Sequence, residues 1–292
     1  MPGRLKRFFG SPGGDPLGRS VRLPAHAAYV HWDLGREPLS SVSFDITMHA
    51  DPGESIGEYL SPYNGSIDGH QIYFGIQSDV YQPDVGGVGK GCIFSTWWTF
   101  DAADTRPESD GFIQLGTHEG RFVGVRRVYE WGVGDYRLTV ERAEQEGDGD
   151  WFAMSIQPIQ PIQPIQQVGP VGPVGSVVSS GARPLPTGAV VALGALRFRR
   201  ADPDRAATIA PGGPAFLEIY SNADTYADIA AWSLDLMAYG DDRRAMGARS
   251  EYPAFPYAEV PNAEVAYVAD RDRVAMAFGR GIERLHPPAT LF

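Results

Sequence analysis

The segment that decides the fold is Cys92–Phe100, CIFSTWWTF, which is rich in the β-branched and aromatic residues that favour strands. Successive side chains of a strand point to opposite faces, so Trp97 and Trp98 must face opposite ways. The face that carries Trp98 is the more apolar. We therefore expect Trp98 to enter the core and Trp97 to lie with Ser95 and Thr99 on a semi-polar face.

Strand-like segments flank this one on both sides. Ser41–His49 alternates cleanly between apolar and polar residues, as a half-buried strand does. Glu54–Gly69 and Asp79–Gly91 are rich in turn formers and are predicted loops, and Ala275–Arg284 is a short helix or a strand. Phe112–Arg142 has the spacing of an antiparallel meander with a turn at Gly132–Asp135. Further strands are predicted at Gln71–Ser78, Trp151–Ile156, Val190–Arg199, Ala215–Tyr220, Ala231–Ala238 and Val265–Ala269. About a dozen short strands without a sustained helical period indicate an all-β fold, an antiparallel two-sheet β-sandwich.

The composition excludes several classes of protein. With 43% hydrophobic and 21% charged residues over 292 positions the chain is globular, and 35 glycines and 24 prolines favour many tight turns. A net charge of −11 makes nucleic acid an unlikely partner, and no apolar run is long enough to span a membrane. The first ten residues, MPGRLKRFFG, lack the apolar run of a secretory signal. We expect a flexible arm over residues 1–20 and a cytoplasmic location.

A low-complexity insert interrupts the later strands. PIQ repeats three times from Pro158, and GPV, GPV and GSV follow from Gly169. Proline at every third position favours extended polyproline II, so residues 157–187 are predicted to be an inserted loop within a single domain, 21–292. A second interpretation is that Pro158–Val178 docks in an aromatic groove of a protein partner.

Several short motifs, in this order along the chain, resemble a family called domain of unknown function 3472. They are Tyr73-Phe74-Gly75-Ile76-Gln77, Ile93-Phe94-Ser95-Thr96-Trp97, Glu119-Gly120, the run from Tyr129 to Tyr136 (YEWGVGDY), and Gly194-Ala195-Leu196-Arg197-Phe198. The resemblance implies a lectin-like, jelly-roll type β-sandwich, often found in secreted bacterial proteins, with no established activity. It therefore favours an extracellular location, whereas the absent signal peptide and the proline-rich insert depart from the pattern.

The candidate site is an aromatic platform for a sugar. Sugar-binding sandwiches stack pyranose rings on exposed aromatics and bind the hydroxyls with carboxylates and amides. Trp97 is the leading platform, and the residues predicted to join it are Gln77, Asp79, Glu119, Tyr129 and Trp131. The sequence thus favours a non-catalytic protein that binds carbohydrate or a related polar ligand. The competing interpretation is that these aromatics only close the core.

Two other functions stay open. The first is a structural or assembly protein that makes protein contacts through the insert or a sheet edge. The second is a glycoside hydrolase or lyase, which needs two facing carboxylates such as Glu119 with Asp79 or with Glu130. No E-x-D-x-x-E strand signature supports it.

The sequence predicts no cofactor. Cys92 is the one cysteine, so it cannot form an internal disulfide, and its place on an apolar strand face predicts an inert buried thiol. The six histidines show no zinc-binding spacing. Calcium is left open, because the turns carry oxygen ligands at Asp79, Asp84, Asp101 and Asp104.

Overall fold

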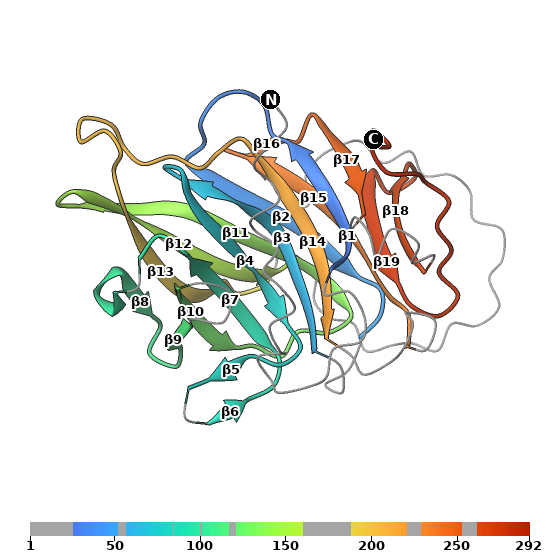
Figure 1. Cartoon of the computed structure of the whole chain (residues 1–292), viewed down its shortest axis with the longest axis horizontal. Helices are drawn as coiled ribbons and strands as arrows, with labels where there is room; N and C mark the ends of the chain where they lie inside the picture. Colours follow the sequence, from blue (N-terminus) through green and yellow to red (C-terminus); the bar gives the residue numbers. More distant parts are fainter. Residues whose placement is uncertain are drawn as a thin grey trace.

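The computed structural model describes residues 26–51, 57–83, 85–99, 101–116, 121–159, 188–220, 229–252 and 262–292. Within them the chain forms two large antiparallel sheets that lie one over the other (Figure 1). The predicted all-β sandwich is confirmed. Among these residues, no helix has the length and apolar character that crossing a bilayer would require.

Sheet A has eight strands. In spatial order they are β17 (Gly247–Glu251), β1 (His26–Asp33), β14 (Gly212–Tyr220), β3 (Gly57–Ile67), β4 (His70–Gln77), β7 (Gly91–Thr96), β10 (Phe122–Val128) and β9 (Phe112–Gly116). The neighbours pair antiparallel, and β4 and β7 align Phe74 with Phe94 and Tyr73 with Ser95. The strand predicted to decide the fold is thus central in this sheet.

Sheet B has nine strands. In order they are β18 (Ala263–Val268), β19 (Arg273–Phe278), β15 (Trp232–Gly240), β2 (Ser41–Met48), β11 (Gly134–Glu146), β12 (Gly149–Pro158), β13 (Val191–Arg199) and β8 (Thr105–Pro107), and β16 (Arg243–Arg244) pairs with β15. A small separate hairpin is formed by β5 (Tyr81–Gln82) and β6 (Gly86–Gly87). A short 3₁₀ turn, η2 (Ala102–Asp104), precedes β8.

The core lies between the sheets and follows the alternation of the strands. In β2 the four apolar residues of the predicted inward face, Val42, Phe44, Ile46 and Met48, are buried in the hydrophobic core. They face Phe74 and Phe94 of sheet A, and the rings of Phe44 and Phe74 lie 5.9 Å apart. Burial of this kind contributes about 25 cal/mol per Å² of apolar surface. The sandwich therefore depends mainly on packing between its two sheets.

The prediction of a loop over Glu54–Gly69 is wrong for its described part, because Gly57–Ile67 forms β3. A β-bulge between Leu60 and Tyr63 accommodates Pro62 within the strand. Gly65 leaves room for the Tyr63 ring, since a Cβ at Gly65 would lie 2.2 Å from that ring. Pro62 and Gly65, which are common in turns, are therefore accommodated within a strand here.

The predicted meander is also wrong in part. β9 and β10 pair in sheet A as expected, but β11 belongs to sheet B and pairs with β2 and β12. The turn at Gly132–Asp135 therefore leads from one sheet to the other. Ala275–Arg284 lies partly in β19, so a strand is correct there and a helix is not.

The insert is bracketed as predicted, because β12 and β13 are antiparallel neighbours. Residues 160–187, and with them most of the low-complexity repeat, lie outside the described residues, as does the predicted arm over residues 1–20. The first described strand, β1, was not expected from the sequence pattern.

Candidate functional site

A row of aromatic rings crosses the outer face of sheet A, the face turned away from sheet B. Side chains on this face alternate with the core residues of the same strands, so Tyr73 points outward between the buried Ile72 and Phe74. We call the rings the aromatic row; in spatial order they are Tyr29 of β1, Phe216 of β14, Tyr73 of β4, Trp97 directly after β7, and Phe122 of β10.

The rings of the aromatic row contact one another in sequence. The centroids are 6.4 Å apart for Tyr29 and Phe216, 6.2 Å for Phe216 and Tyr73, 5.4 Å for Tyr73 and Trp97, and 6.0 Å for Trp97 and Phe122. Tyr29, Phe216 and Phe122 are buried, whereas Tyr73 and Trp97 keep intermediate exposure. Trp97 and Tyr73 are therefore the members of the row that solvent reaches.

The two neighbouring tryptophans turn to opposite faces as predicted, but Trp98 keeps intermediate exposure and only packs against the core instead of entering it. Trp98 packs against the core, where its ring stacks on His70 with centroids 3.7 Å apart. Trp97 turns to the outer face and its main-chain N–H donates to Gln71 across the strands at 3.3 Å. Both residues come directly after β7, which ends at Thr96 instead of running on to Phe100.

Polar side chains hydrogen-bonded to one another lie beside the aromatic row on the same face. Arg126 is buried, and it donates from Nε to Oε1 of Gln114 at 2.9 Å and from Nη1 to Oγ of Ser95 at 2.9 Å. Its guanidinium also lies 6.0 Å from the Phe122 ring. These hydrogen bonds hold the side chains of Arg126, Gln114 and Ser95 in fixed positions beside the aromatic row.

Four of the six predicted site residues lie elsewhere, around Lys90 at the opposite end of β7. We call Asp51, Glu58, Gln77, Lys90 and Trp131 the Lys90 cluster. The Nζ of Lys90 donates to both carboxylate oxygens of Asp51 at 2.6 Å and to the main-chain carbonyl of Trp131 at 3.1 Å. The same Nζ lies 4.6 Å from the centroid of the Trp131 ring.

The prediction that Trp131 joins Trp97 on an exposed aromatic platform is wrong, because Trp131 belongs to the core. Its side chain is 2% exposed, stacks on Trp232 with an interplanar angle of 18°, and donates from Nε1 to the main-chain carbonyl of Gln77 at 3.1 Å. Gln77 is itself buried at the end of β4. Trp131 therefore joins the two sheets, and both side chains are too buried to present a face to a ligand.

Tyr129 and Asp79 also contribute to this end of the sandwich. Tyr129 packs against the core, edge-on to Tyr136, and burial raises the pKa of its hydroxyl to about 12. The Asp79 carboxylate accepts from the N–H of Gly89 at 3.2 Å and so braces the turn before β7. Glu119, the sixth predicted residue, lies outside the described residues.

The residue that the sequence reasoning missed is Glu58. It lies on β3, on the inward face that it shares with Leu60, and its side chain is 1% exposed. Within the part of the chain that the structure describes, neither carboxyl oxygen has a hydrogen-bond partner. Burial, followed by the negative charge of Asp51, raises the pKa of Glu58, and Lys90 lowers it; the net pKa is about 9. Period-two alternation through Leu60 was the signal that places Glu58 inside, and the predicted loop concealed it.

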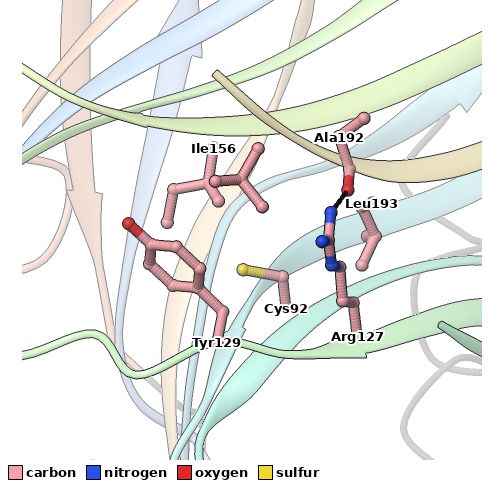
Figure 2. Close-up of a pocket in the computed structure, with 7 residues that line it drawn as sticks. Cys92, Arg127, Tyr129, Ile156, Ala192 and Leu193 are labelled. Carbon is pink, nitrogen blue, oxygen red and sulfur yellow. Dashed lines mark hydrogen bonds between the residues drawn. The ribbon is translucent and has the colours of Figure 1, made fainter. Parts of the chain in front are cut away.

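A small space between the sheets surrounds Cys92 (Figure 2). It is too narrow to admit a water molecule. In Figure 2, Cys92 lies between Tyr129 and Arg127 and its sulfur points to the Tyr129 side. The Arg127 guanidinium donates to the carbonyl of Ala192. Burial raises the pKa of the thiol to about 12. The predicted burial of Cys92 is confirmed, and its low reactivity stays a prediction.

The acidic turn residues considered for calcium are dispersed. Asp101 caps η2 by accepting from Ala103 at 2.9 Å, and Asp104 accepts from Arg197 and from Thr99. Asp84 lies outside the described residues. Among the residues that the structure describes, no group of three or more His, Cys, Asp or Glu side chains gathers as metal ligands would.

Comparison with known proteins gives little further guidance. No protein-family profile matches the chain, and no curated protein matches it. Among solved structures the chain is similar to one titled "Crystal structure of Scytalido-glutamic peptidase with a peptide based transition state analog", with a TM-score of 0.39 and 7% sequence identity. The match covers 89% of this chain and 100% of that one. A TM-score this low supports no inference about ligand or reaction.

Proposed function

We propose that this β-sandwich binds carbohydrate on the outer face of sheet A, with Trp97 and Tyr73 as the stacking platform. The observation that carries the proposal is the pairing of these two partly exposed rings, 5.4 Å apart and inclined by 34°, on a sheet face. The negative faces of aromatic rings attract the C–H groups of a pyranose. Two neighbouring rings therefore suit two neighbouring sugar units.

The supporting residues make the platform rigid. Trp97 is held between Tyr73 and Phe122, and the hydrogen-bonded set of Arg126, Gln114 and Ser95 lies buried beside it. A binding surface whose side chains are ordered beforehand loses less entropy when the ligand binds. Asp79, Gln77, Tyr129 and Trp131 are not part of this platform, because they lie at the other end of β7.

The platform predicts modest affinity and selectivity for chains of sugars over single sugars. Each subsite contributes little alone, so an oligosaccharide that covers both rings should bind more tightly than a monosaccharide. In the two alternatives, protein docking through Pro158–Val178 and the glycosidase pairs with Glu119 involve residues outside the described ones, and protein contacts through a sheet edge stay a prediction.

The test is affinity electrophoresis and a glycan array with the full chain, using β-glucan, xylan, mannan, galactan and pectin as probes. We expect at least one polysaccharide to bind, and Trp97→Ala and Tyr73→Ala to lower the affinity at least tenfold. Trp98→Ala is the matched control, because Trp98 packs on the core and should lose stability without losing binding. Absence of binding to every glycan would overturn the proposal, as would unchanged binding by Trp97→Ala.

A further inference from the structure

The Lys90 cluster joins the two sheets through one ion pair. Asp51 follows β2 of sheet B, whereas Lys90 precedes β7 of sheet A. Their contact at 2.6 Å therefore links the end of one sheet to the beginning of a strand in the other. The exposed fraction is 41% for the Asp51 side chain and 7% for that of Lys90, so the pair extends from the surface toward the core.

Glu58 lies deeper still and belongs to the same sheet as Lys90. It is in β3, two strands away from β7, and its main chain exchanges hydrogen bonds with Ser78 at the end of β4. Its carboxyl group is buried and accepts no hydrogen bond from the side chains and N–H groups of the described residues. A buried carboxylate without donors is costly, so the neutral acid is the form that this environment tolerates.

The charges around Glu58 set up a competition for one cation. Strand register brings Glu58 and Lys90 level with each other on either side of Ser78, because Tyr59 pairs with Gln77 and Gln77 pairs with Gly91. Asp51 and Lys90 act electrostatically on Glu58, and Asp51 acts in turn on the Tyr136 hydroxyl of β11. While Glu58 is neutral, Lys90 neutralises Asp51 alone. If Glu58 became an anion, two carboxylates would compete for one ammonium group. The buried Glu58 carboxylate would gain more from pairing with Lys90 than Asp51 does, because water cannot solvate it.

We propose that Glu58, Lys90 and Asp51 form a proton-operated latch between the two sheets. When Glu58 loses its proton to a solvent base, the carboxylate draws Lys90, which keeps its own proton, away from Asp51. The contact between Lys90 and Asp51 crosses from sheet A to sheet B, whereas a contact between Lys90 and Glu58 stays within sheet A. Loss of one proton thus removes the ion pair between the sheets at this end of the sandwich, while the stacking of Trp131 on Trp232 stays in place.

Trp131 reports on this latch because it touches Lys90 twice. The ammonium group lies over its ring and donates to its carbonyl, so a movement of Lys90 changes the surroundings of the indole. The aromatic row is at the opposite end of β7. The latch can therefore be tested independently of sugar binding.

The first experiment is a ¹³C NMR titration of the full chain, labelled at the glutamate carboxyl carbon, from pH 5 to pH 10. We expect one glutamate to titrate near pH 9 and its resonance to be absent from Glu58→Gln. Glu130→Gln is the matched control, because Glu130 is exposed and its removal should leave that resonance in place. Titration of every glutamate below pH 7 would overturn the proposal, whether or not Glu58→Gln folds.

The second experiment follows the ¹⁵N–¹H signal of the Trp131 indole over the same pH range. We expect it to shift together with the Glu58 carboxyl in the wild type and to stay constant in Glu58→Gln. Lys90→Met should also abolish the shift, since no cation would then move. An indole signal that stays unchanged while Glu58 titrates would show that the acid is buried without acting on Lys90, and the latch would be refuted.

Discussion

The indole N–H of Trp131 donates to the main-chain carbonyl of Gln77 at 3.1 Å, which ties the connection after β10 to the end of β4. The same ring lies under Lys90 and against Trp232 of sheet B. A tryptophan that the sequence suggested for a ligand is thus part of the packing between the sheets. This placement leads to a prediction that separates stability from binding.

Trp131→Ala should destabilise the protein without weakening its binding of sugars. Removing a fully buried tryptophan costs about 3–5 kcal/mol in unfolding free energy, because a cavity remains and Lys90 loses the ring beneath it. Chemical denaturation and affinity electrophoresis, measured on the same preparation, would check both halves. A stable Trp131→Ala variant that no longer binds glycan would show instead that Trp131 is part of the binding site.

Gly75→Ala should disrupt the pairing of β3 with β4. A Cβ at position 75 would lie 1.8 Å from the carbonyl oxygen of Leu60, so the two strands could not keep their distance. We expect a loss of about 3 kcal/mol in unfolding free energy. Gly132→Ala is the control, because a Cβ there meets Asp51 at an ordinary 3.5 Å. Equal stability of the two variants would contradict this account of the strand pair.

Cys92 should resist thiol reagents in the folded protein. Its side chain is 1% exposed and burial raises its pKa to about 12, so the reactive thiolate is scarce at pH 8. We expect slow modification by a chromogenic disulfide reagent in buffer and rapid modification in denaturant. Complete modification of the native protein within the mixing time would show that the space around Cys92 is open to solvent.

Glu58 should make the stability of the fold depend on pH. Its pKa is about 9 in the folded chain, against an ordinary value of 4.5, so the folded state holds a proton that the unfolded state releases. This contribution is complete below pH 4.5 and is lost progressively as the pH rises through 9. Between these two pH values, the unfolding free energy of Glu58→Gln should therefore rise relative to that of the wild type by about 1.4 kcal/mol per pH unit. The measurement is chemical denaturation of both proteins at pH 6, 7 and 8. A difference in unfolding free energy that stays the same at the three pH values would show that the pKa of Glu58 is not raised.

The architecture could be predicted well because strand alternation is a local property. The inward set of β2 and the outward turn of Trp97 follow from period two alone, and both are found in the structure. The loop predicted over β3 fails because Pro62 and Gly65 are tolerated there by a bulge and by the Tyr63 ring, which are tertiary contacts. Local composition cannot reveal such contacts.

The candidate site could be predicted only in part for a related reason. Strand alternation states which way a side chain points but not which end of a sheet it occupies. Trp97 and Gln77 face outward on adjacent strands, yet β4 and β7 run antiparallel and bring Gln77 opposite Gly91, far along the strand from Trp97. The burial of Trp131 depends on Trp232, about a hundred positions later in the chain.

The most direct test of sugar binding on the outer face of sheet A is a ¹⁵N–¹H NMR titration of the six tryptophan indoles with an oligosaccharide of the glycan that binds best. The Trp97 signal, assigned from the spectrum of Trp97→Phe, should shift in a saturable way while those of Trp131 and Trp232 stay in place. A saturable shift confined to Trp131 or Trp232, or a bound oligosaccharide that leaves the Trp97 indole unperturbed, would contradict the account.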